Sequence, residues 1–224
     1  DYQNHLLFKY FQMKTVPKSN IKFSKFKESQ KPFSHMFDEQ LFNNCSDNTQ
    51  INGFYQSPKY FMNVEETIRQ DFKFKKQISN KGNKLFEDFQ TTCSIHIRRG
   101  DYLKKKHSIH GLITEYSLLE ELKKQISREN FKGIRIFTDS PELIDLNVSK
   151  SLHENIVFDK GGSSIEVFKR MSNHKGLIAS NSSFSLWAGI LGDIENFSIP
   201  SYWMKNINSS ILGLKNIKRY NCSF

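Results

Sequence analysis

The stretch that decides the fold is TCSIHIRRGD, residues Thr92–Asp101. Its first part, Thr92–Ile97, contains no Lys, Arg, Asp or Glu, and this uncharged run predicts a buried strand. The charged residues and glycine of Arg98–Asp101 predict a turn at the carboxyl end of that strand. Because side chains alternate along a strand, His96 and Arg98 should share one face and Arg99 should point the other way.

Strand and helix patterns alternate after this stretch. The chain gives three further strands, at Gly133–Phe137, Ile156–Phe158 and Gly176–Ala179. Helical patterns lie between and after them: Thr114–Glu129, a helix opened by the capping box of Ser163 and Glu166, and, after the last strand, Leu186–Leu191. In the first helix, we expect the buried side to carry Tyr116, Leu119, Leu122 and Ile126. The alternation predicts a parallel α/β layer from about residue 91 onward.

The residues before this layer give weaker patterns. Ile51–Gln56 has the character of a short strand. Ser57 suits a helix N-cap with Pro58 behind it, and Phe61, Val64, Ile68 and Phe72 then predict a helix running to about Asp71. The polar, glycine-containing stretch Ser79–Asn83 is a candidate linker.

Composition narrows the class of protein. With 224 residues, 37% hydrophobic residues, 11 Gly and 5 Pro, the chain is neither collagen-like nor of low complexity, and it is long enough for a buried core. Its net charge of +10 favours an anionic partner, such as nucleic acid, a membrane surface or a phosphorylated small molecule. No apolar run approaches the roughly 20 residues that cross a bilayer. The three cysteines are too few and too scattered for a disulfide framework or a metal cluster and indicate reduced thiols.

Polar clusters follow three of the predicted strands, and ligands of open parallel sheets bind beyond the carboxyl ends of strands. They are His96–Asp101, Thr138–Glu142 and Asn181–Ser185. Each cluster has a plain alternative: a solvated arginine pair bridged to Asp101, helix capping at Ser140, and helix capping by Ser182 or Ser183. The alternatives stay open for each cluster taken alone, and Asp139 has no capping role to explain it.

Taken together, these clusters resemble the α-1,2-fucosyltransferases of glycosyltransferase family 11. The resemblance is carried by the following phrases: Gly53–Ser57 (GFYQS), His96–Leu103 (HIRRGDYL), Phe137–Asp139 (FTD), Met171–Leu191 (MSNHKGLIASNSSFSLWAGIL) and Pro200–Trp203 (PSYW). It implies an inverting, metal-independent enzyme that transfers L-fucose from GDP-fucose to a galactoside hydroxyl, with no cofactor. It also implies a GT-B fold of two Rossmann-like halves, here residues 1–83 as the incomplete acceptor-side half with linker and 84–224 as the GDP-fucose-binding half.

The resemblance also implies roles for individual residues. Arg98 would hold the β-phosphate and stabilise the leaving GDP, Arg99 would support the loop or the nucleotide, and Asp139 would lie on the ribose or base side. The helix start would line the diphosphate, and its residues are Asn181, Ser182, Ser183, Phe184 and Ser185.

Elementary chemistry agrees with these roles. Negative charge develops on the departing phosphate, so donors aimed at it stabilise the transition state. The chain has no Asp-x-Asp pair to hold a divalent cation, so arginine must supply the positive charge. A base near the acceptor hydroxyl is also needed, and His96 and Asp101 are the catalytic candidates, although His96 is equally suited to a buried core position.

Three departures from the family pattern stand out. Ser140 replaces a second Asp, and Leu186-Trp187 replaces a double Trp. The glycine-rich turn with which family members begin has no counterpart before Gly53, and the chain starts at Asp1. We therefore expect an N-terminally truncated sequence whose product, as written, is unstable or inactive.

Rival functions remain. A non-catalytic nucleotide- or carbohydrate-binding relative is one, and a basic nucleic-acid-binding protein is another, though the sequence has no reader motif and its lysines form no single stripe. Composition indicates a bacterial source. We expect a cytoplasmic protein or one bound peripherally to the inner membrane, with a Golgi enzyme as the alternative.

Overall fold

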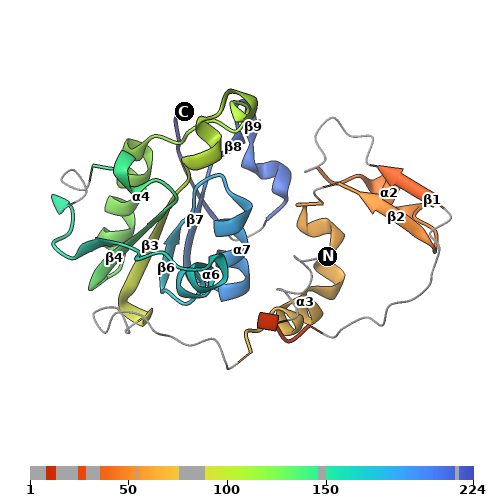
Figure 1. Ribbon diagram of the computed structural model, residues 1–224, viewed down its shortest axis with the longest axis horizontal. Coiled ribbons are helices and arrows are strands. Elements are labelled where there is room, and N and C mark those ends of the chain that lie inside the picture. Colours follow the sequence, from red (N-terminus) through yellow and green to blue (C-terminus); the bar gives the residue numbers. More distant parts are fainter. Residues whose placement is uncertain are drawn as a thin grey trace. The chain divides into compact units, whose positions relative to one another are not determined.

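A computed structural model describes residues 9–13, 25–28, 36–53, 55–75, 89–145, 150–214 and 217–224. The chain divides into two compact units, drawn in Figure 1. The first comprises Asp1–Gln77 and Ser210–Lys215, and the second comprises Ile78–Ser209 and Asn216–Phe224. The linker expected at Ser79–Asn83 lies outside the described residues, and the division into halves with separate substrates stays a prediction.

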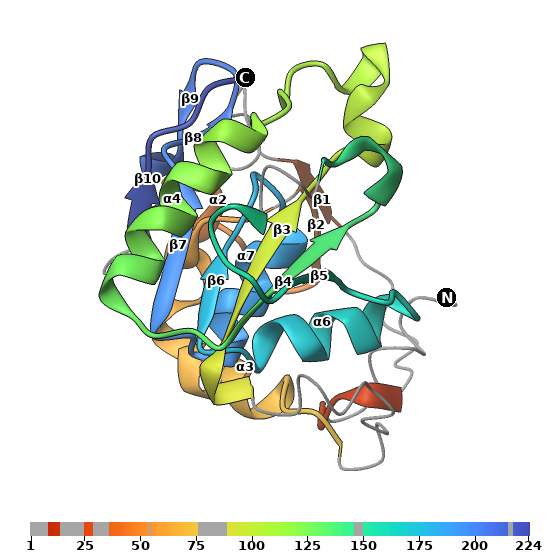
Figure 2. The ribbon, with the colours of Figure 1, turned by 90° about the vertical axis from the view of Figure 1, so that its left-hand side faces the viewer.

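A parallel sheet forms the centre of the second unit (Figure 2). Its strands are β3 (Thr92–Ile97), β4 (Gly133–Thr138), β5 (Ile156–Phe158), β6 (Gly176–Ile178), β7 (Asn196–Pro200) and β10 (Lys218–Tyr220). They lie in the order β10-β7-β6-β3-β4-β5, and every neighbouring pair is parallel. The chain thus starts in the middle, winds to one edge, returns, and winds to the other. This is the strand order of a Rossmann-like, doubly wound fold.

Helices cover both faces of this sheet. They are α4 (Glu115–Arg128), α6 (Ser164–Ser172) and α7 (Ser183–Gly192). The connection from β3 to β4 and the connections from β5 to β6 and β6 to β7 run in opposite directions across the sheet. Because such crossovers are right-handed, α4 lies on one face and α6 and α7 lie on the other.

The two faces of the central strand β3 differ in chemistry. Cys93, Ile95 and Ile97 pack into an apolar core with residues of α4 such as Leu118 and Leu122. The residues between them face α6 and α7 instead and are polar: Ser94 bonds to His174, and His96 bonds to Ser185. Strand β3 is therefore buried on both sides, but only one side is hydrophobic.

Short elements join these parts. Two 3₁₀ turns, η5 (Gly100–Leu103) and η6 (Lys105–His107), follow β3, and η7 (Pro141–Leu143) follows β4. The hairpin of β8 (Tyr202–Met204) and β9 (Ile207–Asn208) follows β7, while η4 (Phe89–Thr91) and η8 (Ser209–Leu212) are single turns.

The first unit contains a small parallel pair of strands, β1 (Lys25–Glu28) and β2 (Thr49–Asn52). Its helical elements are α2 (Glu39–Asn43), the 3₁₀ turns η1 (Pro58–Tyr60) and η2 (Met62–Val64), and α3 (Glu65–Asp71). The GT-B pairing of two Rossmann-like halves stays a prediction, whereas the mixed α/β class is confirmed by the second unit.

Several predicted elements are confirmed. Strand β3 has the predicted bounds, β4, β5 and β6 differ from theirs by one residue at most, and the capping box of Ser163 and Glu166 opens α6. Helix α4 has Thr114 as its N-cap, as its predicted start requires.

Other predictions were wrong. Tyr116 is 71% exposed, because the buried face of α4 is centred on Leu118 and Leu122. The expected helix after Ser57 is broken into η1, η2 and the short α3, and Val64 is exposed. Helix α7 begins at Ser183, not at Leu186.

The close packing of α6 on α7 depends on Gly192. A Cβ at this position would collide with the backbone carbonyl of Ser172 at the end of α6. We expect Gly192→Ala to lower the free energy of unfolding by about 1–3 kcal/mol, the usual cost of overpacking. Urea denaturation measures this free energy of unfolding, and Lys124→Ala, at an exposed position of α4, is the control. Equal stability of Gly192→Ala and the wild type would contradict the packing described here.

Candidate functional site

Two neighbouring strands end at one edge of the second unit's sheet. Strands β3 and β6 pair up to the partners Ile95 and Ile178, so Arg98 after β3 and Asn181 after β6 leave the sheet at the same edge. The strand order reverses between these two strands, since their connections pass to opposite faces. Ligands of doubly wound sheets bind in the crevice beyond such a point.

Arg98 is held between two carboxylates at this edge. One terminal nitrogen lies 2.5 Å from Oδ1 of Asp101, and the other lies 2.8 Å from Oδ2 of Asp139. The guanidinium carbon also lies 5.6 Å from the centre of the Tyr102 ring. About a third of the Arg98 side chain stays exposed, so the guanidinium is fixed in orientation and still accessible to a ligand.

Asp139 closes the turn after β3. Its Oδ1 accepts a hydrogen bond from the backbone N–H of Arg99 at 2.9 Å, while Oδ2 pairs with Arg98. Gly100 has a φ of +20°, and a Cβ there would collide with the Asp139 carboxylate. The glycine is therefore needed so that this carboxylate can approach the backbone.

Arg99 points away from Arg98, as strand alternation predicts. It is buried, donates to the backbone carbonyl of Arg98 at 3.1 Å, and lies 3.7 Å from Glu115 at the start of α4. Burial lowers the pKa of its guanidinium, and the charges of Glu115 and Asp139 counter that effect. These contacts agree with a role for Arg99 in supporting the loop.

The side chain of Asp101 is more exposed than that of Asp139, and Arg98 is the partner of its carboxylate. Desolvation opposes its ionisation, but the charge of Arg98 and the hydrogen bond from it outweigh that effect and lower the pKa of Asp101. A carboxylate in this state is a weak proton acceptor.

His96 is buried behind the strand. Its Nδ1 lies 2.9 Å from the hydroxyl of Ser185 and 3.0 Å from that of Ser180. Burial and the nearby charge of Arg98 lower its pKa to about 4, against a partial opposing effect of Asp139. The structure thus favours the core-histidine alternative over a catalytic base for His96.

The start of α7 follows β6 at the same end of the sheet. Ser182 is the N-cap, and its side chain makes no capping hydrogen bond, while Ser183 at the first helical position is exposed. Ser185 is fully buried against His96, and Phe184 packs edge-on against Phe168 of α6. Of the predicted diphosphate-lining residues, Ser182 and Ser183 lie at the helix start, whereas Ser185 faces the interior.

Asn181 has a structural role that the sequence did not indicate. Its side-chain amide donates to the backbone carbonyls of His110 and Gly111, and its backbone carbonyl accepts from the Tyr102 hydroxyl at 2.9 Å. The Tyr102 ring stacks on His110 at 4.6 Å. Asn181 and Tyr102 thus tie the loop after β3 to the start of α7. The HIRRGDYL phrase of the family resemblance contains Tyr102, but the sequence did not indicate what this residue does.

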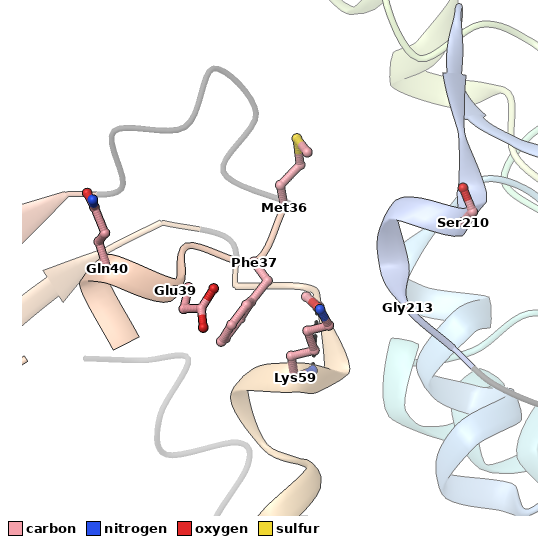
Figure 3. A pocket seen from close by; sticks show the side chains of 8 residues that line it. Met36, Phe37, Glu39, Gln40, Lys59, Ser210 and Gly213 are labelled. Carbon is pink, nitrogen blue, oxygen red and sulfur yellow. Dashed lines mark hydrogen bonds between the residues drawn. The ribbon is translucent and has the colours of Figure 1, made fainter. Parts of the chain in front are cut away.

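The first unit contains a pocket and one of the phrases that carry the family resemblance. Figure 3 shows a pocket of the first unit, lined by Met36, Phe37, Glu39, Gln40, Ser57, Lys59, Ser210 and Gly213. Gly53, Tyr55 and Ser57 of the predicted GFYQS phrase belong to the first unit, and Phe54 lies outside the described residues. Over the described ranges, no group of at least three His, Cys, Asp or Glu residues is arranged to hold a metal ion. The cysteines are free.

Comparison with known proteins finds one family over nearly the whole chain. The family described as "Glycosyl transferase family 11" matches residues 4–207, which include Arg98, Asp139 and Asn181–Ser185. The chain is also similar to an alpha-1,2-colitosyltransferase of Escherichia coli, with 28% identity over 193 residues. The alignment covers 82% of this chain and 66% of that relative, so the chain spans just under two thirds of its length.

Two buried histidines give the second unit a pH dependence. Burial lowers the pKa of His96 from 6.5 to about 4 and that of His174 to about 3, with Arg135 and Arg170 adding to the effect at His174. The unfolded chain therefore binds more protons than the folded chain below about pH 6.5, and stability should fall from there towards pH 4.

Urea unfolding across this range measures the loss, and NMR of the ring signals of both histidines should show no titration above about pH 5. Protonation of His96 near pH 6.5 without loss of stability would contradict its burial.

Proposed function

The chain belongs to glycosyl transferase family 11, and from this premise we propose that it transfers L-fucose from GDP-fucose to a galactoside hydroxyl. The family match confirms the resemblance that the motifs indicated. The donor, the acceptor, the inverting course and the independence from metal are parts of the proposal.

One observation carries it: a solvent-accessible guanidinium, held by carboxylates on two different strand ends, lies at the reversal point of a doubly wound sheet. This is where such folds bind nucleotides. The start of the ten-residue helix α7 follows the neighbouring strand β6, and a helix start presents free N–H groups and a positive dipole end to an anion. Together they form a site suited to a diphosphate.

In the proposed reaction, the oxygen of the acceptor hydroxyl attacks C1 of the sugar. The bond between C1 and the β-phosphate oxygen breaks, its electron pair stays on the phosphate of the departing GDP, and the hydroxyl proton passes to a base or to water. The new bond forms on the face opposite the leaving group, so the configuration at C1 inverts.

Arg98 stabilises the charge that develops on the leaving diphosphate. Its two ion pairs involve one terminal nitrogen each, of which the pair with Asp101 is also a hydrogen bond, and a guanidinium carries five N–H donors in a planar fork. Among the described residues, the other donors of Arg98 remain for phosphate oxygens. Preorganised donors of this kind typically contribute about 10²–10³-fold each to the rate.

The base is not assigned. His96 is buried and already bonded to serine hydroxyls, and Asp101 is paired with Arg98. When a diphosphate competes for Arg98, Asp101 would lose part of its ion pair and become a better acceptor, which makes it the stronger of the two candidates.

The relative's name supplies a second candidate donor. It is called a colitosyltransferase, and colitose is L-fucose without its 3-hydroxyl, so both sugars fit the same reaction. An identity of 28% to this relative leaves room for either sugar.

The surroundings of the reaction are proposed only in outline. A galactose-terminated oligosaccharide is the proposed acceptor, and the cytoplasmic side of the membrane is the proposed location. In the part of the chain that the structure describes, none of the helices is both long and apolar enough for a membrane span.

Replacement of Arg98 tests the proposal. We expect Arg98→Ala to lower kcat/KM for fucosyl transfer about 10²–10³-fold, because the leaving diphosphate loses its main donor. Arg98→Lys should recover only part of this, since a lysine cannot form the fork of hydrogen bonds. The exposed Arg128→Ala, at the end of α4, is the matched control and should leave transfer unchanged. Undiminished transfer by Arg98→Ala would sink the assignment.

The donor is tested by competition between GDP-fucose and GDP-colitose at equal concentrations. A site that hydrogen-bonds the 3-hydroxyl should prefer fucose by 10⁴-fold or so, because colitose leaves its buried polar groups unpaired. A preference for GDP-colitose would replace the proposed donor, and binding of oligonucleotide with no response to GDP would replace the proposed function.

A further inference from the structure

We infer that Asp139 is a positioning residue, which fixes Arg98 and the turn after β3 in the arrangement that receives the diphosphate. This inference rests on the proposed function for its catalytic consequence. It departs from the ribose or base contact that the family resemblance implies for Asp139, because both carboxylate oxygens are engaged by the turn.

The first ground is the division of the two oxygens. Oδ1 accepts the backbone N–H of Arg99 at 2.9 Å, and Oδ2 lies 2.8 Å from the guanidinium of Arg98. One carboxylate thus holds the backbone and the side chain of consecutive residues. Because Asp139 follows β4, it joins the end of that strand to the end of its neighbour β3.

The second ground is the space around the carboxylate. Only a glycine at position 100 lets the carboxylate come so close to the turn, since a Cβ there would collide with Oδ2. The carboxylate after β4 can therefore take this position only because the residue at position 100, after β3, has no side chain. A group whose purpose was to reach a ribose would not need this contact.

The third ground is the contrast with Asp101, the second carboxylate on Arg98. Asp101 lies three residues along the same turn, and its carboxylate accepts a backbone hydrogen bond from its own N–H, whereas Asp139 accepts one from Arg99 on the neighbouring strand end. Its side chain is 40% exposed, against 28% for Asp139. A diphosphate that takes donors from Arg98 would displace Asp101 more easily, so Asp139 is the carboxylate that remains.

The fourth ground is electrostatic. Two carboxylates beside one arginine partly neutralise its positive charge, and this weakens the binding of an anion. The ion pairs must therefore have another, favourable effect on the site. Asp139 gives orientation: it holds a flexible side chain in one place before the ligand arrives. Misplacement of a reacting group by about 1 Å can cost about 10²-fold in rate.

The test uses Asp139→Asn, which keeps an oxygen for the Arg99 N–H but replaces the partner of Arg98 by an amide. Binding of GDP by calorimetry and fucosyl transfer are measured for the wild type, Asp139→Asn, Arg98→Ala and the double variant. We expect Asp139→Asn to lower kcat about 10–100-fold. In the Arg98→Ala background, the same change should alter kcat and the Kd for GDP by less than about twofold, since its target is gone.

A ribose contact gives the opposite pattern. If Asp139 binds a ribose hydroxyl, then 2′-deoxy-GDP or 3′-deoxy-GDP should bind more weakly than GDP to the wild type but equally to Asp139→Asn. In a positioning role, the ratio of Kd values for deoxy-GDP and GDP is the same in both proteins. Additive effects in the double variant, or a ratio that Asp139→Asn abolishes, would overturn the inference.

A readout without nucleotide separates this inference from the proposed function. In the free protein, hydrogen exchange of the Arg99 amide should be protected in the wild type and in Asp139→Asn, and at least about tenfold faster in Asp139→Ala. Asp101→Asn is the matched control and should leave this amide unchanged. Failure of the wild type to bind GDP would contradict the proposed function alone, whereas an Arg99 amide indifferent to Asp139→Ala would contradict the positioning role.

Discussion

The buried hydrogen bonds of His96 are the constraint on which the candidate site depends. Its Nδ1 reaches the hydroxyls of Ser180, just after β6, and of Ser185, in the first turn of α7. One neutral ring in the central strand therefore fixes the end of the neighbouring strand and the start of the helix that follows. Because the ring is buried and its pKa is lowered to about 4, this link is intact throughout the neutral range.

The other face of strand β3 is mostly apolar. Cys93, Ile95 and Ile97 pack into the core under α4, and the Cys93 thiol also donates to Oε1 of Gln125 at 3.4 Å. Hydrogen bonds are directional, so the polar face of the strand demands one register. The polar face of β3 thus sets the position of α7, and the turn of Arg98–Asp101, closed by Asp139, sets the position of the guanidinium. One half of the proposed diphosphate site is therefore held by the buried His96, and the other half by the partly exposed Asp139.

The sequence predicted those parts that depend on local patterns. The uncharged run of Thr92–Ile97 and the capping box of Ser163 specify β3 and the start of α6 almost without help from the rest of the chain. Strands β7 and β10 were not predicted, because β10 is a three-residue edge strand with two charges and β7 ends in a proline, so neither has a strand signature of its own. Tyr116 shows the same limit, since helical spacing cannot say which of several apolar stripes faces the sheet.

Site residues follow the same division. Arg98 and Asp139 were predicted as site residues from their places at strand ends. The sequence did not predict that they form an ion pair across 40 residues of chain, nor that Gly100 makes room for this pair. Those relations arise from the strand order. A structure of the protein with GDP bound tests the proposed diphosphate site. We expect the diphosphate to lie against the Arg98 guanidinium and the backbone N–H groups at the start of α7, with Asp139 still bonded to the Arg99 amide. A diphosphate bound elsewhere, such as on the exposed Lys104 and Lys105, would contradict it.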